Sequence, residues 1–234
     1  MPLFLQHTGN TPLWLALLVL FAALMFLGIG KAGFGGGVGL VTPPLLAMIM
    51  PVKLLLPLML PLLIVCDVAS LWTWRGKWDL RNFRRLLPGT VIGVAAGTGL
   101  LGTLPERELK AGLGALAVAF VVIQLARQRN GTSEAHYSPK AWHGFVAGLL
   151  GGFCSVLAHA AGPVITLFLL PQRLGKERFV ATTVLYYSVL NWIKVPSYVL
   201  TGMLTVMVLG AAVWLVPLIL LGVYTGVRLN RAIP

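Results

Sequence analysis

The chain has 234 residues, of which 58% are hydrophobic and only 10% are charged. Soluble domains carry about 25% charged residues, so this composition excludes a soluble globular protein and predicts an all-α, polytopic integral membrane protein. The net charge of +12 would indicate nucleic acid in a soluble protein, but here the cations lie in short loops between apolar spans, where they signal topology. We therefore expect the lipid bilayer, and no nucleic acid, as a partner.

The first apolar stretch, residues 11–30, has no charged residue and is long enough to cross a bilayer as a helix. No basic segment precedes it and no small-x-small site closes it, so we expect it to be retained rather than removed as a signal peptide. It leads into a G-x-G-x-x-G motif at Gly28, Gly30 and Gly33. A dinucleotide site needs a strand before this motif and an acidic residue about twenty positions later, and both are missing. The sequence therefore predicts no cofactor.

The sequence also gives no sign of a metal site or of catalysis. Cys66 and Cys154 lie in separate apolar runs without a C-x-x-C spacing, which predicts small buried side chains and neither a disulfide nor a metal site. There is no H-E-x-x-H and no G-x-S-x-G motif, and His159 is the one histidine clearly inside an apolar span. We therefore do not expect an enzyme.

The chain resembles itself at long range, which predicts two homologous halves. A Phe-x9-Pro pattern at 34–44 recurs at 153–163, and "GVAAG" at 93–97 recurs as "GVYTG" at 222–226. The glycines at four-residue spacing around "GVAAG" predict a close-packing helix face. The predicted division is a first transmembrane repeat (1–130), a cytoplasmic linker (131–140) and a second repeat (141–234) that lacks the last helix of the first.

Each half contains a short apolar segment next to glycine and proline, at 38–50 and at about 160–170. At 1.5 Å per residue, neither segment crosses about 30 Å of hydrocarbon as helix alone. Paired short segments at matching places in two halves are typical of the central site of a transporter. We expect the glycines to break a helix there and to turn backbone groups toward a cavity.

The distribution of cations among the loops distinguishes between short segments that cross the membrane and short segments that are re-entrant. If the segments cross, fourteen loop cations share one side and only Lys53, Arg107 and Lys110 lie on the other; if they are re-entrant, the split is eight against nine. The positive-inside rule favours crossing, which gives halves of inverted topology with the N-terminus outside and the C-terminus in the cytoplasm. The short lengths favour the re-entrant alternative, which stays open.

Ionisable side chains inside apolar spans are candidates for function because their burial is costly. Asp67, His159 and Lys194 lie within such spans, and Lys31 lies beside the glycines. Alignment of the halves places Asp67 near Lys194, which predicts an ion pair. The alternatives are a purely structural pair for Asp67, a backbone hydrogen bond for His159, and snorkelling toward the interface for Lys194.

At these residues the chain resembles the sulfite exporter TauE/SafE family of membrane anion transporters. The resemblance covers nearly the whole chain and rests on "GFGGGVGLVTPPLL", "DVASLWTWRGKWDLRNFRRLLPG", "GFCSVLAHAAGP" and "FVATTVLYYSVLNWIKVPSYVLTG", in this order. It implies export of small sulfur-containing anions, such as sulfite, sulfoacetate or related organosulfonates, by a multi-pass protein of the cytoplasmic (inner) membrane. The missing last helix departs from the usual family length and leaves a homo-oligomer open.

The residues at matching positions form the expected substrate path, with Asp67 as a coupling residue or ion-pair partner. A small anion suits this set, because Lys31, Lys194 and His159 oppose Asp67 alone and helix N-termini add positive potential. Tyr187, Asn191 and Lys194 share one helical face. A cation or metal-ion carrier that uses Asp67 is the alternative. The predicted path consists of Lys31, Gly33, Gly35, Gly36, Gly37, Pro43, Pro44, His159, Gly162, Pro163, Thr182, Thr183, Asn191 and Lys194.

Overall fold

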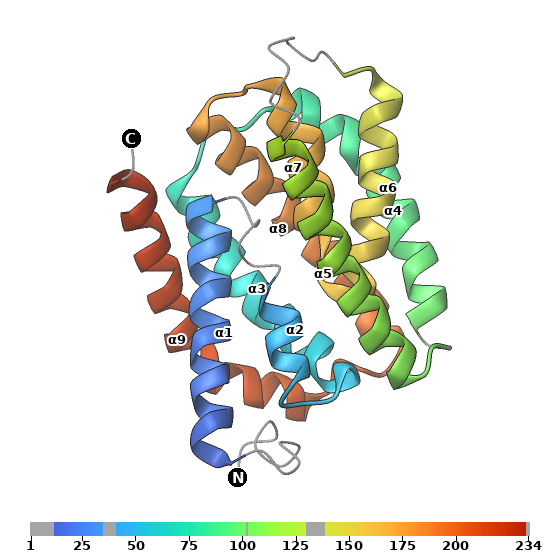
Figure 1. Cartoon of the computed structure of the whole chain (residues 1–234), viewed down its shortest axis with the longest axis vertical. Helices are drawn as coiled ribbons and strands as arrows, with labels where there is room; N and C mark the ends of the chain where they lie inside the picture. Colours follow the sequence, from blue (N-terminus) through green and yellow to red (C-terminus); the bar gives the residue numbers. More distant parts are fainter. Residues whose placement is uncertain (1–11, 35–40, 102, 130–138, 233–234) are drawn as a thin grey trace.

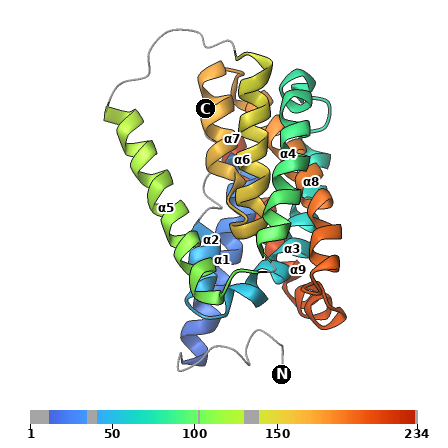
Figure 2. The ribbon, with the colours of Figure 1, turned by 90° about the vertical axis from the view of Figure 1, so that its right-hand side faces the viewer.

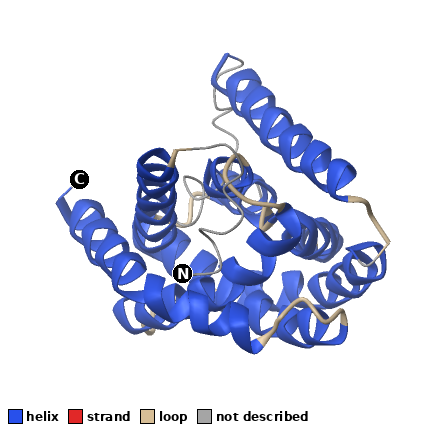
Figure 3. Ribbon diagram, turned by 90° about the horizontal axis from the view of Figure 1, so that it is seen from below, coloured by secondary structure: helices blue, strands red, loops and turns tan. Residues whose placement is uncertain are grey.

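The computed structural model describes residues 12–34, 41–101, 103–129 and 139–232, and within these ranges all regular structure is helical (Figure 3). Four of these helices, α1, α3, α6 and α9, are long and apolar enough to cross a membrane, which confirms the predicted all-α, polytopic class. The α-helices are α1 (Leu13–Phe34), α2 (Thr42–Ala47), α3 (Val52–Thr73), α4 (Leu80–Leu101), α5 (Glu106–Arg129), α6 (Ala141–Ala158), α7 (Ala161–Leu169), α8 (Lys176–Leu200) and α9 (Val206–Ala232), and a 3-10 turn, η3 (Leu170–Gln172), follows α7.

Two helix pairs make the most extensive contacts, α4 with α6 and α1 with α9 (Figures 1 and 2). Glycines bring these helices together. A Cβ on Gly93 would overlap the carbonyl oxygen of Leu149, and a Cβ on Gly28 would lie 2.7 Å from the carbonyl carbon of Gly222. Side chains do not fit between backbones this close, so the predicted close-packing glycine face is confirmed.

The chain breaks between α6 and α7 and not at Gly33. His159 follows α6 in the left-handed conformation, with φ of 50°, and α7 begins two residues later. By contrast, α1 continues through Gly33 to Phe34, and Gly33 lies so close to α9 that a Cβ there would meet the backbone of Gly226. Gly33 itself is therefore a packing residue within α1, and the break expected at the glycines from Gly33 to Gly37 stays a prediction, because residues 35–40 lie outside the described ranges.

Hydrogen bonds between segments define the two ends of the helix bundle. At one end Lys77 contacts Glu177, the Arg85 guanidinium donates to Pro139, and Lys176 donates to the Asn230 carbonyl. At the opposite end the Glu106 carboxylate accepts the backbone N–H groups of Val52 and Lys53, at the start of α3. The first end is rich in cations, as the predicted cytoplasmic side requires.

The order of helices recurs along the chain. Both α1–α4 and α6–α9 contain a long helix, a short helix and two long helices. Each first helix packs on the fourth helix of the other half, and α1 ends at the cationic end of the bundle where α6 begins. This arrangement is the one that inverted repeats produce, and the inverted relation of the two halves stays a prediction.

We expect single cysteines at Glu108 and Gly202, in a cysteine-free variant, to react with a membrane-impermeant maleimide added outside the cell. Cysteines at Gly76 and Gly175 should stay unlabelled until the membrane is permeabilised, because both belong to the cationic end. All four positions are exposed, so access decides the result in variants that fold; folding must be checked because a cysteine is strained at the positive φ of Gly76, Gly175 and Gly202. External labelling at Gly175 would contradict inverted topology.

We expect Gly93→Ala to lower the free energy of unfolding in detergent by about 1–3 kcal/mol, because the new methyl group must push α4 away from α6. Gly99→Ala in the same helix is the matched control, since nothing lies within 4 Å of its Cβ position. The control should be neutral or slightly stabilising, because alanine favours helix over glycine. Equal stability of the two variants would show that α4 and α6 do not depend on this close approach.

Candidate functional site

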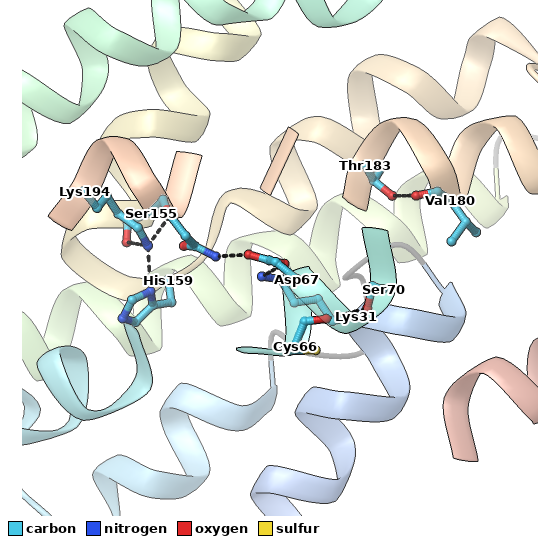
Figure 4. A network of polar contacts seen from close by, with 10 residues as sticks. Lys31, Cys66, Asp67, Ser70, Ser155, His159, Val180, Thr183 and Lys194 are labelled. Atoms are coloured by element: carbon cyan, nitrogen blue, oxygen red, sulfur yellow. Dashed lines mark hydrogen bonds and ion pairs between the residues drawn. The ribbon is translucent and has the colours of Figure 1, made fainter. Parts of the chain in front are cut away.

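A buried ion pair joins α1 to α3 in the middle of the bundle (Figure 4). The Lys31 ammonium contacts the Asp67 Oδ1 atom, and the Asn191 side chain donates to Asp67 Oδ2 over 2.6 Å. Lys31 is 5% exposed and Asp67 is 1% exposed. The Lys31 ammonium also lies over the Tyr187 ring, 5.6 Å from its centroid. Both carboxylate oxygens are therefore engaged, by one cation and one amide.

A second cationic contact lies beside the first, on α8. The fully buried Lys194 ammonium donates to Ser155 Oγ over 2.9 Å and lies 2.8 Å from His159 Nδ1. His159 Nε2 lies 2.9 Å from the Leu56 carbonyl oxygen, which can only accept a hydrogen bond. Nε2 must therefore carry a proton, which makes Nδ1 of a neutral imidazole the acceptor for Lys194 (Figure 4).

The predicted pairing of Asp67 with Lys194 is wrong. Asp67 pairs with Lys31, and Lys194 points to α6 and His159 instead. The snorkelling alternative for Lys194 is also contradicted, because its ammonium ends inside the bundle on Ser155. The backbone hydrogen bond proposed as the alternative for His159 is present, with Leu56 of α3 as its acceptor.

The buried charges at this centre do not cancel. Lys31, Asp67 and Lys194 are the buried charged side chains in the described ranges. Two ammonium groups face one carboxylate there, and the neutral His159 adds no charge. Counted with all three side chains ionised, the cluster has a formal charge of +1 in a region of low dielectric constant, where an excess charge costs several kcal/mol unless an anion balances it.

A cavity of about 40 Å³ adjoins this cluster, which is room for about three water molecules or one small anion. The ammonium of Lys194 lies behind Ser155 and His159, which form part of the cavity wall. The start of α7 faces the cavity through Ala161 and Gly162, and the N–H groups of a first helical turn have no partner within the helix. The lining residues are Leu27, Lys31, Met59, Leu63, Ser155, His159, Ala161, Gly162, Tyr187, Leu190 and Asn191.

Four of the predicted path residues, Lys31, His159, Gly162 and Asn191, thus line one cavity. Ser155 is the polar lining residue that the sequence reasoning missed. It lies in the last turn of α6, four residues before His159, but a serine in a glycine-rich apolar helix carries no other signal. Tyr187 was predicted on the face shared by Asn191 and Lys194, and it lines the cavity as well.

Other predicted path residues lie elsewhere. Thr182 Oγ accepts the Asp79 N–H and donates to the Arg178 carbonyl, near the cationic end, and Thr183 Oγ donates to the Val180 carbonyl. Gly33 packs on α9 and its carbonyl accepts from Asn230. Pro43 and Pro44 lie in the first turn of α2 and Pro163 in that of α7, whereas Gly35, Gly36 and Gly37 lie outside the described residues.

Comparison with known proteins found one family. The family model described as "Sulfite exporter TauE/SafE" matches residues 20–234. A search of curated proteins and a search of solved structures returned no match. The matched range contains every described residue of the buried cluster and of the cavity wall.

We expect His159→Ala to lower the free energy of unfolding by about 1–3 kcal/mol, because the Leu56 carbonyl then loses its side-chain donor and Lys194 loses an acceptor. His159→Asn is the control for the backbone, since asparagine tolerates the left-handed conformation but is too short for both contacts. It should lose less stability than the alanine variant. Wild-type stability of both variants in thermal unfolding would show that the imidazole contacts contribute nothing.

Proposed function

The chain belongs to the sulfite exporter TauE/SafE family of membrane transporters, and we propose that it exports small sulfur-containing anions across the cytoplasmic membrane as a multi-pass protein. Sulfite, sulfoacetate and related organosulfonates are the proposed substrates. The observation that carries the proposal is the unbalanced positive charge of the buried centre, taken over the described residues. A small anion that enters the adjoining cavity would cancel this charge.

The cavity wall offers donors in place of a ring of cations. Asn191 and Ser155 present an amide and a hydroxyl, and the start of α7 presents backbone N–H groups at the positive end of a helix dipole. Lys194 supplies positive charge through Ser155 and His159 without lying in the cavity itself. This combination attracts an oxyanion but binds it weakly enough for release, as transport requires.

The cations at one end of the bundle also support transport of an anion. Lys77, Arg85, Lys176 and Arg178 surround the loops at this end, which is the proposed cytoplasmic side. Positive potential at the mouth of a transport path raises the local concentration of anions and speeds their entry. An exporter needs such a surface on the side from which its substrate comes.

The alternative of a cation or metal-ion carrier has no supporting observation. Asp67, on which it depends, is engaged by Lys31 and Asn191. In the residues that the structure describes, no group of three or more His, Cys, Asp or Glu side chains lies close enough together to hold a metal ion. The anion site is therefore the better-supported use of this centre.

We expect Lys194→Ala to reduce transport of labelled sulfite into proteoliposomes by more than about thirtyfold, given the roughly 2–5 kcal/mol lost on truncating one partner of a buried charged contact. Lys194→Arg should retain part of the activity, because a planar guanidinium keeps the charge but fits Ser155 and His159 poorly. Lys110→Ala is the matched control, since this lysine is half-exposed at the opposite end of the bundle. The control variant should transport sulfite at the wild-type rate.

A panel of sulfite, sulfoacetate and chloride identifies the substrate class in the same assay. Preference for the sulfur anions over chloride supports the proposed function. Absence of wild-type transport for every sulfur anion would overturn it, and normal transport by Lys194→Ala would remove the assignment of the anion to the unbalanced charge.

A further inference from the structure

We infer that Lys31 is a built-in counter-ion: its ammonium occupies the place on Asp67 that a coupling cation would otherwise take, so the anion moves without a cation bound at Asp67. This inference rests on the proposed function, because it concerns how the same centre works. It assigns different roles to the two buried lysines. Lys31 neutralises Asp67, and Lys194 supplies the charge that attracts the anion.

Each oxygen of Asp67 already has a partner, and the carboxylate is buried from solvent. The Lys31 ammonium contacts Oδ1, Asn191 donates to Oδ2 over 2.6 Å, and the carboxylate is 1% exposed. Metal ions such as Ca²⁺ and Mg²⁺ require about six oxygen ligands, and an ammonium needs only hydrogen-bond acceptors. A lysine of α1 is also covalently part of the chain, so unlike a bound ion it cannot dissociate during a transport cycle.

The two lysines differ in their partners. Lys31 contacts a carboxylate directly, whereas the Lys194 ammonium contacts the neutral groups Ser155 and His159. No carboxylate among the described residues lies within ion-pair distance of Lys194. Asp67 is therefore already balanced before substrate arrives, and the remaining charge is that of Lys194.

The position of Lys31 makes the inference testable. Lys31 lines the cavity, so the space beside Asp67 becomes reachable from the cavity when the ammonium is removed. Lys31→Met keeps an apolar stem of similar length but leaves the buried carboxylate without a cation in contact, because Lys194 lies beyond ion-pair distance. Such a charge must recruit a cation or a proton, because burial of an unpaired carboxylate is strongly unfavourable.

The experiment compares the wild-type chain with Lys31→Met in proteoliposomes that contain Na⁺ or choline on both sides. We expect wild-type sulfite transport at the same rate in both media. Lys31→Met should transport about tenfold faster with Na⁺ or at acidic pH than in choline at neutral pH, the size of a typical coupling between two sites. The double variant Lys31→Met, Asp67→Asn removes both charges, and its transport should again be independent of Na⁺ and follow the pH profile of wild type.

Thermal unfolding of the same purified variants separates the inference from the proposed function. Na⁺ should raise the unfolding temperature of Lys31→Met and leave wild type and the double variant unchanged, since only an unbalanced Asp67 binds it. If wild type moves no sulfur anion, the proposed function fails and this measurement still tests the counter-ion. Na⁺-dependent wild-type transport would overturn the inference, as would Lys31→Met with no response to Na⁺ or pH in either assay.

Discussion

Three charged side chains lie buried in the middle of an apolar bundle, and the helices around them are arranged so that each charge meets a polar partner. Lys31, Asp67 and Lys194 are held where an isolated charge costs several kcal/mol, so each needs a partner delivered by another helix. The partners come from α1, α3, α6 and α8, which ties these helices into one arrangement. An error of one turn in any of them would separate a charge from its partner. The polar centre thus selects the packing as strongly as the apolar contacts do.

Glycine contacts at the periphery make this centre possible. Between α1 and α9, and between α4 and α6, backbones approach so closely that a single methyl group would overlap a carbonyl. Helices in lipid gain little from the hydrophobic effect and associate through such close packing. Because α1 is fixed against α9 at Gly28 and Gly33, Lys31 between them is fixed in rotation and points to Asp67. The glycine motif that imitates a dinucleotide site therefore positions a charged side chain.

Sequence reasoning predicted the membrane class and the buried ionisable residues, because the bilayer imposes simple rules of length and charge. It did not predict which of several nearby groups a buried side chain contacts. Alignment of the halves gave the register of Asp67 and Lys194, but a lysine stem spans several ångströms and packing decides where its ammonium ends. It also missed Ser155, since the hydroxyl of a serine in an apolar helix can donate a hydrogen bond to a backbone carbonyl of the same helix. The break at His159 was predicted from its surroundings, whereas Gly33 showed that glycine spacing alone does not separate a break from a packing face.

The two halves share a scaffold but divide the chemistry unequally. Lys31 and Asp67, from the first half, form a pair with no net charge, and Ser155, His159, Asn191 and Lys194, from the second, provide the unbalanced charge and most of the polar cavity wall. The second half thus carries the excess charge that an anion would meet. Two polar contacts join the halves at this centre: the Asn191 amide of the second half donates to Asp67 of the first, and His159 of the second contacts the Leu56 carbonyl of the first. The orientation of the balanced pair in the first half therefore depends on a side chain of the second.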